Sequence, residues 1–384
     1  MQSYDATPIT KKKQWDDFYH LPKIIYKHDN KQVLELKAQI SEELNADKNP
    51  IAKTCKFQAF IVYKGERVVA RAVAIVNIDL DRKMNKKIGQ IGYLEFINDA
   101  ESLLNIIGIC STWFKQHSCD TIWTDTRFSL NYQVGIQIDG FDQRHSFLMP
   151  SQPKYYLQLL TNIGFYNIKS MNAYNVDLLD NYLPSKEISD QAQALRNEGY
   201  VVRNMNRSDL WSCLLDYNTR WENNFAHTPF SLKELTHLKS SMNIFLDTRF
   251  CFLIEKEGEL AGYLFTFPDY YHDIKDWRGK LNLINVVSFI WKYKIKKKVT
   301  GLKTAIIGVT EPFRGKRLSS LLNDELLKQA IHNNCHYIER SWILEDNIAS
   351  IKQAQKMGAV KYKEFAIFEI KLSNIQSYKY KQAI

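Results

Sequence analysis

The stretch from residue 301 to residue 322 constrains the fold of this chain more than any other. It opens with an apolar run, residues 305–309, and a turn that contains Pro312 follows. A basic segment then leads into leucines at helical spacing, namely Leu318, Leu321, Leu322 and Leu326. This order predicts a strand that runs directly into the N-terminus of a helix.

The junction between this strand and this helix has the features of an anion site. The first N–H groups of a helix have no partner within the helix, and the helix dipole places partial positive charge there. Arg314, Lys316 and Arg317 add three cationic side chains at the same point. Together these groups favour an anion such as a pyrophosphate. The alternative is a run of Lys and Arg on a solvated surface.

The same stretch resembles the acyl-CoA-binding segment of the GNAT acetyltransferase superfamily, whose loop, Arg/Gln-x-x-Gly-x-Gly/Ala, wraps a pyrophosphate. Arg314 takes the first position, whereas Arg317 and Ser319 stand where the pattern has glycines. Arg317 is the larger departure, because glycine lets the backbone approach the phosphates closely. The resemblance implies acetyl-CoA or another acyl-CoA as co-substrate. It implies contacts to that co-substrate from Ile307, Gly308, Val309, Arg314, Gly315, Lys316, Arg317, Leu318, Ser319 and Asn347.

The elements that follow continue the resemblance. Residues 341–347 predict a strand, residues 348–356 a short helix that ends at Gly358, and residues 365–372 a closing strand. The same order recurs in the first half as a hairpin, a strand, a helix and a closing strand, at 57–77, 88–96, 101–116 and 170–178. We therefore predict an α/β fold with two tandem GNAT-like lobes, each a mixed, mostly antiparallel sheet flanked by helices.

This interpretation divides the chain into an N-terminal tail (1–22), a first lobe (23–178), a linker (179–199) and a second lobe (200–384) with an insertion (268–300). In the first lobe the turn from strand to helix, residues 97–101, has two carboxylates and neither a basic residue nor a glycine. Because carboxylates repel a pyrophosphate, we expect this lobe to be structural or substrate-binding, without a CoA site of its own.

Over most of its length the chain is similar to a group of bacterial proteins with two GNAT-like lobes. The similarity rests on short segments in a fixed order, at 138–142, 149–150, 155–156, 221–224 with Pro229, 267–269 and 342–347. This similarity predicts the fold of the chain, but it does not identify a substrate.

The resemblance implies attack of an amine on an acyl thioester, which needs donors for an oxyanion and a base for the amine proton. In GNAT enzymes the donors are backbone N–H groups of the strand that here includes residues 307–309. Glu345 and Glu311 are the acidic residues nearest to the expected cleft, as catalytic bases or as surface carboxylates. The family's frequent general acid, a tyrosine, falls on Ala354. We expect an N-acyltransferase; the alternative is a non-catalytic GNAT-like protein that binds a ligand or a partner.

Residues 211–230 occupy the region where GNAT proteins build the acceptor pocket. Candidate contacts to a small-molecule amine are Trp221, Asn223, Asn224 and His227. The alternatives are a core tryptophan and a polar loop histidine. Asn347 likewise has an alternative role as the N-cap of the helix that it precedes.

The insertion pairs apolar residues with lysines. Residues 283–298 contain an apolar stretch followed by five lysines. Such a segment fits peripheral contact with an anionic membrane, or cover for a long acyl chain. The alternative is a helix packed between the lobes with a solvated lysine tail.

The bulk properties limit the partners. A net charge of +10 suits CoA, an acidic acyl carrier protein or an anionic membrane. We expect no nucleic-acid partner, because no zinc spacing, RNA-binding aromatic motif or repeat is present. Six scattered cysteines without a Cys-x-x-Cys pair predict neither a disulfide framework nor a metal. With no secretory signal and no apolar run of ~18 residues, we expect a cytoplasmic protein.

Overall fold

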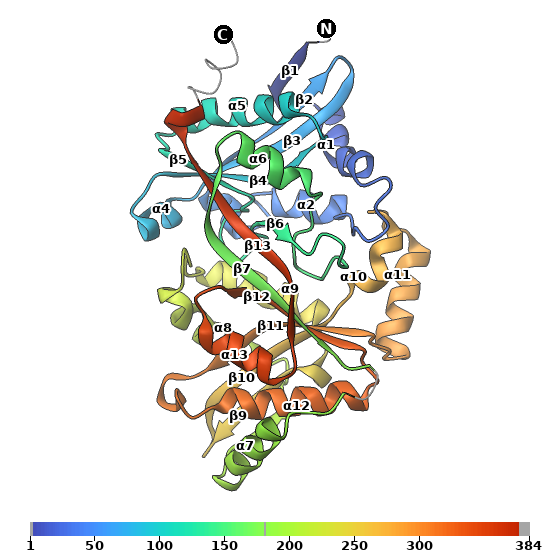
Figure 1. Cartoon of the computed structure of the whole chain (residues 1–384), viewed down its shortest axis with the longest axis vertical. Helices are drawn as coiled ribbons and strands as arrows, with labels where there is room; N and C mark the ends of the chain where they lie inside the picture. The colour runs from blue at the N-terminus through green and yellow to red at the C-terminus, as the bar shows by residue number, and fades with distance from the viewer. Residues whose placement is uncertain (1–2, 180–181, 376–384) are drawn as a thin grey trace.

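The computed structural model describes residues 3–179 and 182–375. The molecule is elongated, with the first lobe at the top of Figure 1 and the second lobe at the bottom. The strands of the first lobe are β1 (Tyr4–Pro8), β2 (Lys56–Lys64), β3 (Arg67–Val76), β4 (Ile88–Phe96), β5 (Thr121–Thr124), β6 (Ile136–Asp139) and β7 (Tyr166–Asp177). Its helices are α1 (Lys12–Ile25), α2 (Lys37–Glu43), α3 (Pro50–Thr54), α4 (Ile78–Met84), α5 (Ala100–Gln116) and α6 (Tyr155–Asn162).

The second lobe follows the same plan. Its strands are β8 (Val201–Asn204), β9 (Phe252–Lys256), β10 (Glu259–Pro268), β11 (Gly301–Val309), β12 (Tyr337–Leu344) and β13 (Val360–Lys371). Its helices are α7 (Lys186–Asn197), α8 (Leu210–Arg220), α9 (Leu232–Phe245), α10 (Tyr271–Ile274), α11 (Leu283–Ile290), α12 (Leu318–His332) and α13 (Ile348–Lys356). The prediction of an α/β fold with two tandem GNAT-like lobes is confirmed.

Local sequence signals set the ends of several elements. The Asp99 side chain caps α5 by accepting a hydrogen bond from the Ser102 N–H, and Ser231 with Glu234 forms a capping box at α9. The turn between β2 and β3 contains Gly65, whose φ of 60° is left-handed and therefore suits glycine.

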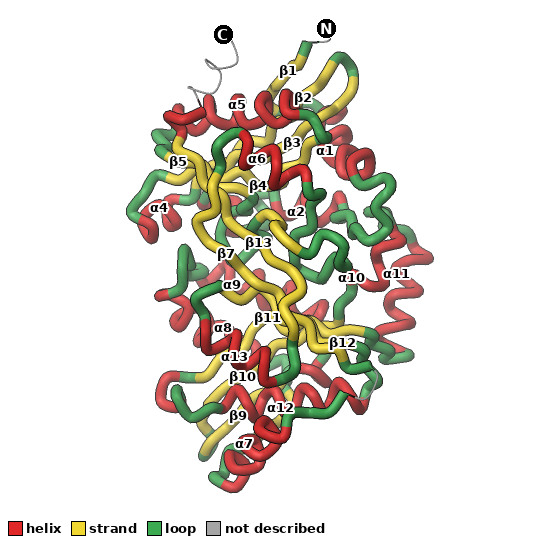
Figure 2. Tube along the Cα trace, in the orientation of Figure 1, coloured by secondary structure: helices red, strands yellow, loops and turns green. Residues whose placement is uncertain are grey.

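The two lobes exchange their last strands, so that all the strands form one sheet (Figures 1 and 2). β13, from the end of the chain, pairs with β5 of the first lobe, and β7 pairs with β12 of the second lobe. β7 and β13 also pair with each other, antiparallel, through the middle of the molecule. The strand order is β1-β2-β3-β4-β5-β13-β7-β12-β11-β10-β9-β8, with β6 beside β13.

The exchange extends to the hydrophobic cores. Tyr174 and Val176 of β7 belong to the core of the second lobe, whereas Ala366, Phe368 and Ile370 of β13 belong to the core of the first. Each lobe therefore depends on a strand from the other half of the chain for its folded core.

Each lobe also contains one parallel pair of strands that diverges. β4 pairs with β5 only over Ile88–Ile91 and Thr121–Thr124. β11 pairs with β12 only over Gly301–Thr304 and Tyr337–Arg340. Beyond these short ladders the strands of each pair are no longer hydrogen-bonded to each other at their carboxyl ends, which is where ligands commonly bind in sheets of this kind.

Two boundaries differ from the sequence-based prediction. Residues 1–22 were expected to be a surface tail, yet Tyr4–Pro8 is β1, paired with β2, and α1 follows it. The expected linker, 179–199, contains α7, whose Ile188, Ala192 and Leu195 are buried in the core of the second lobe. Both segments are polar overall, and it is contact with distant elements that orders them. Within the described residues no helix is both long and apolar enough to span a bilayer.

Candidate functional site

The opening beside β11 has a free backbone edge. β10 pairs with β11 as far as Val309, whereas β12 leaves β11 after Thr304. Ile307 and Val309 are half-buried, and Gly308 is buried. Since successive backbone groups of a strand point to opposite edges, part of the N–H and C=O groups of residues 305–309 face the opening. The contacts predicted for this strand therefore lie at a strand edge that is open on one side.

The loop after β11 presents unpaired N–H groups. A 3₁₀ turn, Glu311–Phe313, leads to Gly315, with φ of 78°, and to Arg317, with φ of 61° and ψ of 25°. Within residues 3–179 and 182–375, no acceptor bonds the backbone N–H of Gly315, Arg317, Leu318 or Ser319. Arg317 thus has the left-handed backbone that suits the glycine of the family pattern, and α12 begins without a side-chain cap, with unpaired N–H groups of the kind that can bind an anion.

The basic side chains of this loop point into solvent. Arg314 is exposed and pairs with Glu311 across 3.1 Å. Lys316 and Arg317 are also exposed, and neither forms an ion pair within the described chain. The exposed Arg317 guanidinium is not buried in the opening between β11 and β12. The three cations therefore belong to the same loop as the unpaired N–H groups and extend into solvent.

The two candidate bases are held at the surface. Glu311 Oε2 lies 2.5 Å from Arg220 and 3.1 Å from Arg314, so two guanidinium groups hold its carboxylate. Glu345 is exposed, and its Oε1 accepts a hydrogen bond of 3.1 Å from the Ser170 N–H. Asn347 caps α13 by accepting a hydrogen bond of 3.2 Å from the Ser350 N–H. The alternative role of Asn347, as the N-cap of the helix that it precedes, is therefore observed.

The candidate acceptor residues follow α8 and border the loop. Trp221 packs on Tyr217, with ring centroids 4.5 Å apart, and lies next to Arg220, which contacts Glu311. His227 is buried, burial lowers its pKa, and its Nε2 has no hydrogen-bond partner within the described chain. Asn223 ends the 3₁₀ turn at 221–223, and the Asn224 N–H bonds back to the Trp221 carbonyl.

This segment also touches the first lobe. Phe225 stacks on Trp123 with ring centroids 5.8 Å apart, and Asn131 donates to the Thr228 carbonyl at 3.1 Å. Lys83 contacts the Glu222 carbonyl. The segment therefore combines a position beside the loop with a structural role in holding the lobes together.

A polar chain that the sequence analysis missed connects α8 to β11. Asp216 pairs with Arg220 at 2.5 Å and accepts a hydrogen bond of 2.9 Å from Tyr263. The Tyr263 ring packs against Gly308 so closely that a Cβ at Gly308 would lie 2.4 Å from the ring. The signal in the sequence was the Asp216 and Arg220 pair at i, i+4 on a predicted helix.

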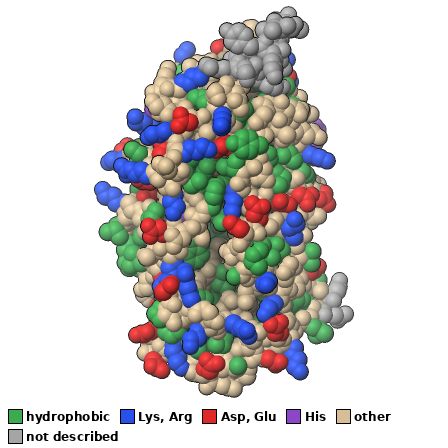
Figure 3. Space-filling view, turned by 60° about the vertical axis from the view of Figure 1, so that its left-hand side comes forward, with side chains coloured by type: hydrophobic (Ala, Val, Ile, Leu, Met, Phe, Trp, Pro, Cys, Tyr) green, Lys and Arg blue, Asp and Glu red, His purple; other side chains and the backbone are tan. Residues whose placement is uncertain are grey.

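One face of the surface has a hollow at mid-height, and Lys, Arg, Asp and Glu side chains are mixed over it (Figure 3). The net charge of +10 is thus not gathered into one basic patch on this face. Within the described residues no group of three or more His, Cys, Asp or Glu is placed to hold a metal ion.

Comparison with known proteins agrees with this architecture. Residues 211–359 match the family model for the Acetyltransferase (GNAT) family. The tandem GNAT protein from the clavulanic acid biosynthesis pathway superposes over 96% of this chain and 99% of its own, with a TM-score of 0.56 at 11% identity. The chain thus has the fold of tandem GNAT proteins.

Two relatives match both GNAT lobes in sequence. Protein YghO of Escherichia coli (strain K12) is 22% identical over 361 residues, which cover 92% of this chain and 91% of that protein. Bacterial ceramide synthase of Caulobacter vibrioides is 23% identical over 378 residues, covering 94% of this chain and 96% of that protein.

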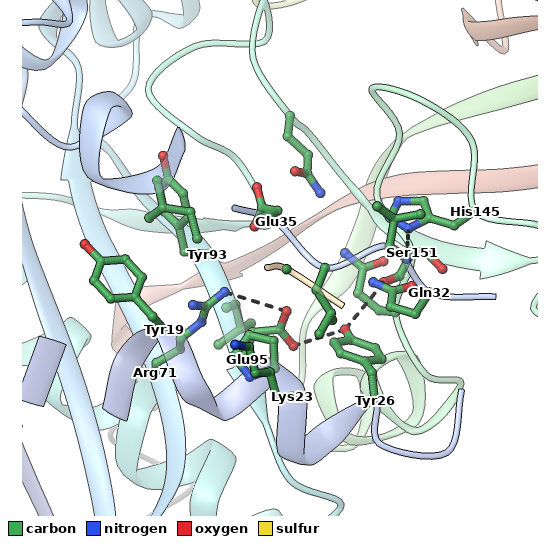
Figure 4. Close-up of a pocket in the computed structure, with 18 of the residues that line it drawn as sticks. Tyr19, Lys23, Tyr26, Gln32, Glu35, Arg71, Tyr93, Glu95, His145 and Ser151 are labelled. Carbon is green, nitrogen blue, oxygen red and sulfur yellow. Dashed lines mark hydrogen bonds and ion pairs between the residues drawn. The ribbon is translucent and has the colours of Figure 1, made fainter. Parts of the chain in front are cut away.

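The first GNAT lobe has a polar cavity of about 190 Å³ at its own diverging strands (Figure 4). Glu95 of β4 and Asp125, just after β5, line it together with Glu35 and Arg71. Figure 4 shows Arg71 and Tyr26 directed toward Glu95. Their distances are 3.9 Å for the ion pair and 3.0 Å for the hydrogen bond from the tyrosine hydroxyl.

Burial controls the ionisation of these groups. It raises the pKa of Glu95, against the opposing effect of Arg71. It also raises the pKa of Asp125 to about 7, with Arg127 opposing and Glu95 adding to the effect. His145 is neutral, because burial lowers its pKa to about 3. The sequence held one local signal of this cavity, the acidic residue Glu95 in a strand, 88–96, that is otherwise uncharged.

Proposed function

We propose that this protein is an N-acyltransferase that moves an acyl group from acyl-CoA to an amine in the second GNAT lobe. The observation that carries the proposal is the uncapped start of α12, where a loop with three basic side chains has four unpaired backbone N–H groups and follows an unpaired strand edge. That arrangement fits a diphosphate followed by an extended amide-bearing arm. The GNAT family match over residues 211–359 supports the same chemistry.

The chain's own groups would bind and orient the reactants. The N–H groups of Gly315, Arg317, Leu318 and Ser319 hold the diphosphate, and the free edge of residues 305–309 holds the arm and polarises the carbonyl. The co-substrate supplies an acyl thioester. As the amine attacks, a C–N bond forms and the C–S bond breaks; the amine loses a proton and the departing thiolate gains one. Ala354, which stands where the family often has a tyrosine acid, is buried in α13 and has no proton to donate. The proton that the thiolate gains therefore comes from water.

We further propose that the acceptor amine belongs to a long-chain amino alcohol. The support is the similarity to bacterial ceramide synthase over 94% of this chain, since a ceramide is the amide of such an amine. The donor is then a fatty acyl-CoA, with a fatty acyl carrier protein as the second source to be tested. The net charge of +10 suits either donor.

The test is thiol release from acyl-CoAs of several chain lengths, and from acyl carrier protein, with short and long-chain amines. We expect release that requires a long-chain amino alcohol, and formation of an amide of matching mass. Acyl-CoA binding without release in any combination would favour the alternative, a non-catalytic binding protein. Two observations keep that alternative in view: Glu345 is exposed, and Glu311 is held by arginines.

Arg314→Glu tests the loop. We expect acyl-CoA affinity in calorimetry to fall roughly tenfold to a hundredfold, because the charge beside the diphosphate is reversed. Arg82→Glu is a matched control, since Arg82 is also exposed and pairs with an acid three residues earlier. Equal affinity of the Arg314 variant and the control would remove the loop from the site.

Glu345→Gln tests the base. If Glu345 accepts the amine proton, the substitution lowers kcat while acyl-CoA affinity stays the same. An unchanged kcat would rule out Glu345 as the base.

A further inference from the structure

We propose that the cavity of the first lobe is a second ligand site, which binds a small hydroxylated molecule through its protonated amine. The cavity lies at the diverging ends of β4 and β5, and residues from α1, the loop at 32–35 and the insertion enclose it. Nothing in the proposed acyl transfer uses it.

Buried polar atoms without partners show that the site is incomplete. Asp125 and Gln32 are 5% and 6% exposed, and both line the cavity. Asp125 Oδ1 and Gln32 Oε1 accept no hydrogen bond from the described residues. An unmet buried acceptor is costly, so each of these oxygens favours a ligand that donates protons. Arg71 and Arg127 also line the cavity, and their Nε–H groups have no acceptor within the described chain, so they could donate to a hydroxyl oxygen of the ligand.

One carboxyl group of the cavity, that of Asp125, suits a cation, because the other acidic side chains of the lining have ion-pair partners. Arg127 pairs with Glu35, across 3.0 Å from its Nη2, and with Glu43 across 3.6 Å, while Arg71 pairs with Glu95. Asp125 is left without an ion pair in the described chain. His145 supplies no charge, because its Nδ1 accepts from the Val33 N–H and its Nε2 therefore donates to the Met149 carbonyl. Lys37 and Asp16, which also line the cavity, pair with each other, and Lys23 lies in the same wall. Among the carboxylates of the lining, Asp125 is the one without an ion pair in the described chain, and it is the group that an ammonium would meet.

The site is separate from the proposed acyl-transfer centre. β4 and β11 are separated in the sheet by β5, β13, β7 and β12, so at about 4.8 Å per strand pair they lie roughly 24 Å apart along it. The insertion nevertheless helps to close the cavity: Tyr271 and Gly279 line it, and Arg278 donates to the carbonyls of Tyr26 and Asp29 at 2.6 and 2.7 Å.

Calorimetry with 2-amino-1,3-propanediol, and with glycerol as its uncharged analogue, tests this site. We expect the amine to bind and glycerol not to bind, and Asp125→Asn to weaken amine binding about tenfold or more. Asp139→Asn, at the exposed end of β6, is the control and should bind as the parent does. Acyl-CoA affinity should be the same in all three proteins, which separates this test from that of the second lobe. No binding of the amine, equal binding of glycerol, or an unaffected Asp125→Asn variant would overturn the proposal.

A different observation carries a second proposal: we infer that α11 and the lysine segment after it rest on an anionic phospholipid bilayer. Within the insertion, large apolar side chains between 49% and 79% exposed occur at Leu281, Leu283, Ile284, Val287, Ile290, Trp291 and Ile295. None of the side chains of α11 is buried. Figure 1 shows α11 along one side of the molecule.

The helix is nevertheless anchored on its opposite side. The centroid of the Phe289 ring lies 5.2 Å from that of Tyr270 and 4.7 Å from that of Tyr293. Tyr293 and Lys292 both contact the Asp273 carboxylate. The exposed residues 283, 284, 287, 290 and 291 fall at helical spacing on the other face. A fixed helix that turns an apolar face outward indicates a surface for binding.

The charge beside this face identifies the partner. Lys294, Lys296, Lys297 and Lys298 are exposed and directly follow the apolar residues. An apolar face with lysines at its edge complements a bilayer with anionic headgroups, where the apolar side chains enter the interface and the ammonium groups meet phosphates.

Co-sedimentation with vesicles of phosphatidylcholine, alone or with added phosphatidylglycerol, tests this surface. We expect binding mainly to the anionic vesicles. Leu283→Gln with Ile284→Gln, and Lys296, Lys297 and Lys298→Glu, should each weaken it about tenfold or more. Reversing the exposed Lys11, Lys12 and Lys13 is the charge-matched control and should change binding little. Equal loss in the control, no sedimentation, or a dimer in light scattering that Leu283→Gln disrupts would overturn the proposal; the dimer would mean that a second copy covers the face.

Discussion

Both lobes contain a diverging pair of parallel strands, but the helix that follows the pair begins with different polar groups in the two lobes. In the second lobe the helix after the pair, α12, begins at Arg317 without a side-chain cap. In the first lobe the corresponding helix, α5, begins at Asp99, whose carboxylate accepts from the Ser102 N–H and from the Tyr4 hydroxyl at 2.6 Å. One helix start thus presents free donors to an anion, and the other is already neutralised by its own carboxylate.

The openings themselves differ in the same sense. Asp125 and Glu95 stand at the opening of the first lobe, whereas the loop of the second carries Arg314, Lys316 and Arg317. The difference teaches that one pair of diverging strands can stand beside free backbone donors or beside a buried, unpaired carboxyl, depending on a few polar residues. The comparison can be tested first through the strands that the lobes exchange, and then through each opening.

The largest effect should come from Phe368→Ala in β13. Phe368 is 4% exposed and belongs to the core of the first lobe, so the substitution should lower the free energy of unfolding by about 3–5 kcal/mol. Hydrogen exchange should show the loss in α5 and β4, although residue 368 lies near the end of the chain. Val360→Ala, at a 70% exposed position of the same strand, should change stability by less than about 0.5 kcal/mol. Faster exchange confined to α12 and β9 would contradict the exchanged arrangement.

Local patterns in the sequence were sufficient to predict the helices and strands, but not which strands pair with one another. The strand at 88–96 and the helix start at residue 318 were predictable, because alternation, turn residues and apolar spacing are local. The exchange of β7 and β13 was not predictable, since both strands mix apolar and polar residues in a way that does not identify the neighbouring strand. β1 was missed for a related reason: its five residues are ordered by pairing with β2, some fifty residues later.

The candidate sites divide in the same way. The loop at 314–319 is one continuous segment, and its position after a strand made it recognisable. Glu35, Glu95 and Asp125, which line the cavity of the first lobe, come from three separate segments. No spacing of residues in the sequence could therefore predict this cavity.

The pH dependence of stability should distinguish the first opening. Asp125 has a pKa of about 7 in the folded protein, mainly through burial, with Arg127 opposing and Glu95 and Glu35 adding to the shift. The carboxyl therefore holds more protons in the folded than in the unfolded state between about pH 4 and 7, where an ordinary Asp titrates near 3.9. Folding stability from this group is then present below about pH 4 and is lost as pH rises toward 7.

Asp125→Asn removes this titration, so we expect the variant to gain on the parent by a few kcal/mol between pH 5 and pH 8. The check is the free energy of unfolding of both proteins across that range, with Asp139→Asn as the control. Parallel curves for Asp125→Asn and the parent would show that the carboxyl is already ionised at pH 5, and that the cavity does not lack a positive charge.

The smallest effect should come from the backbone of the second opening. Arg317 has a φ of 61°, which costs a non-glycine residue about 1–2 kcal/mol. Arg317→Gly and Arg317→Ala both remove the guanidinium, but only glycine removes this strain, offset by about 0.5–1 kcal/mol of chain entropy. If the unpaired N–H groups hold the diphosphate, the glycine variant should bind acyl-CoA as tightly as the parent, within about threefold, and the alanine variant somewhat less tightly. An equal and large loss in both variants would mean that the guanidinium, and not the backbone, distinguishes this opening from that of the first lobe.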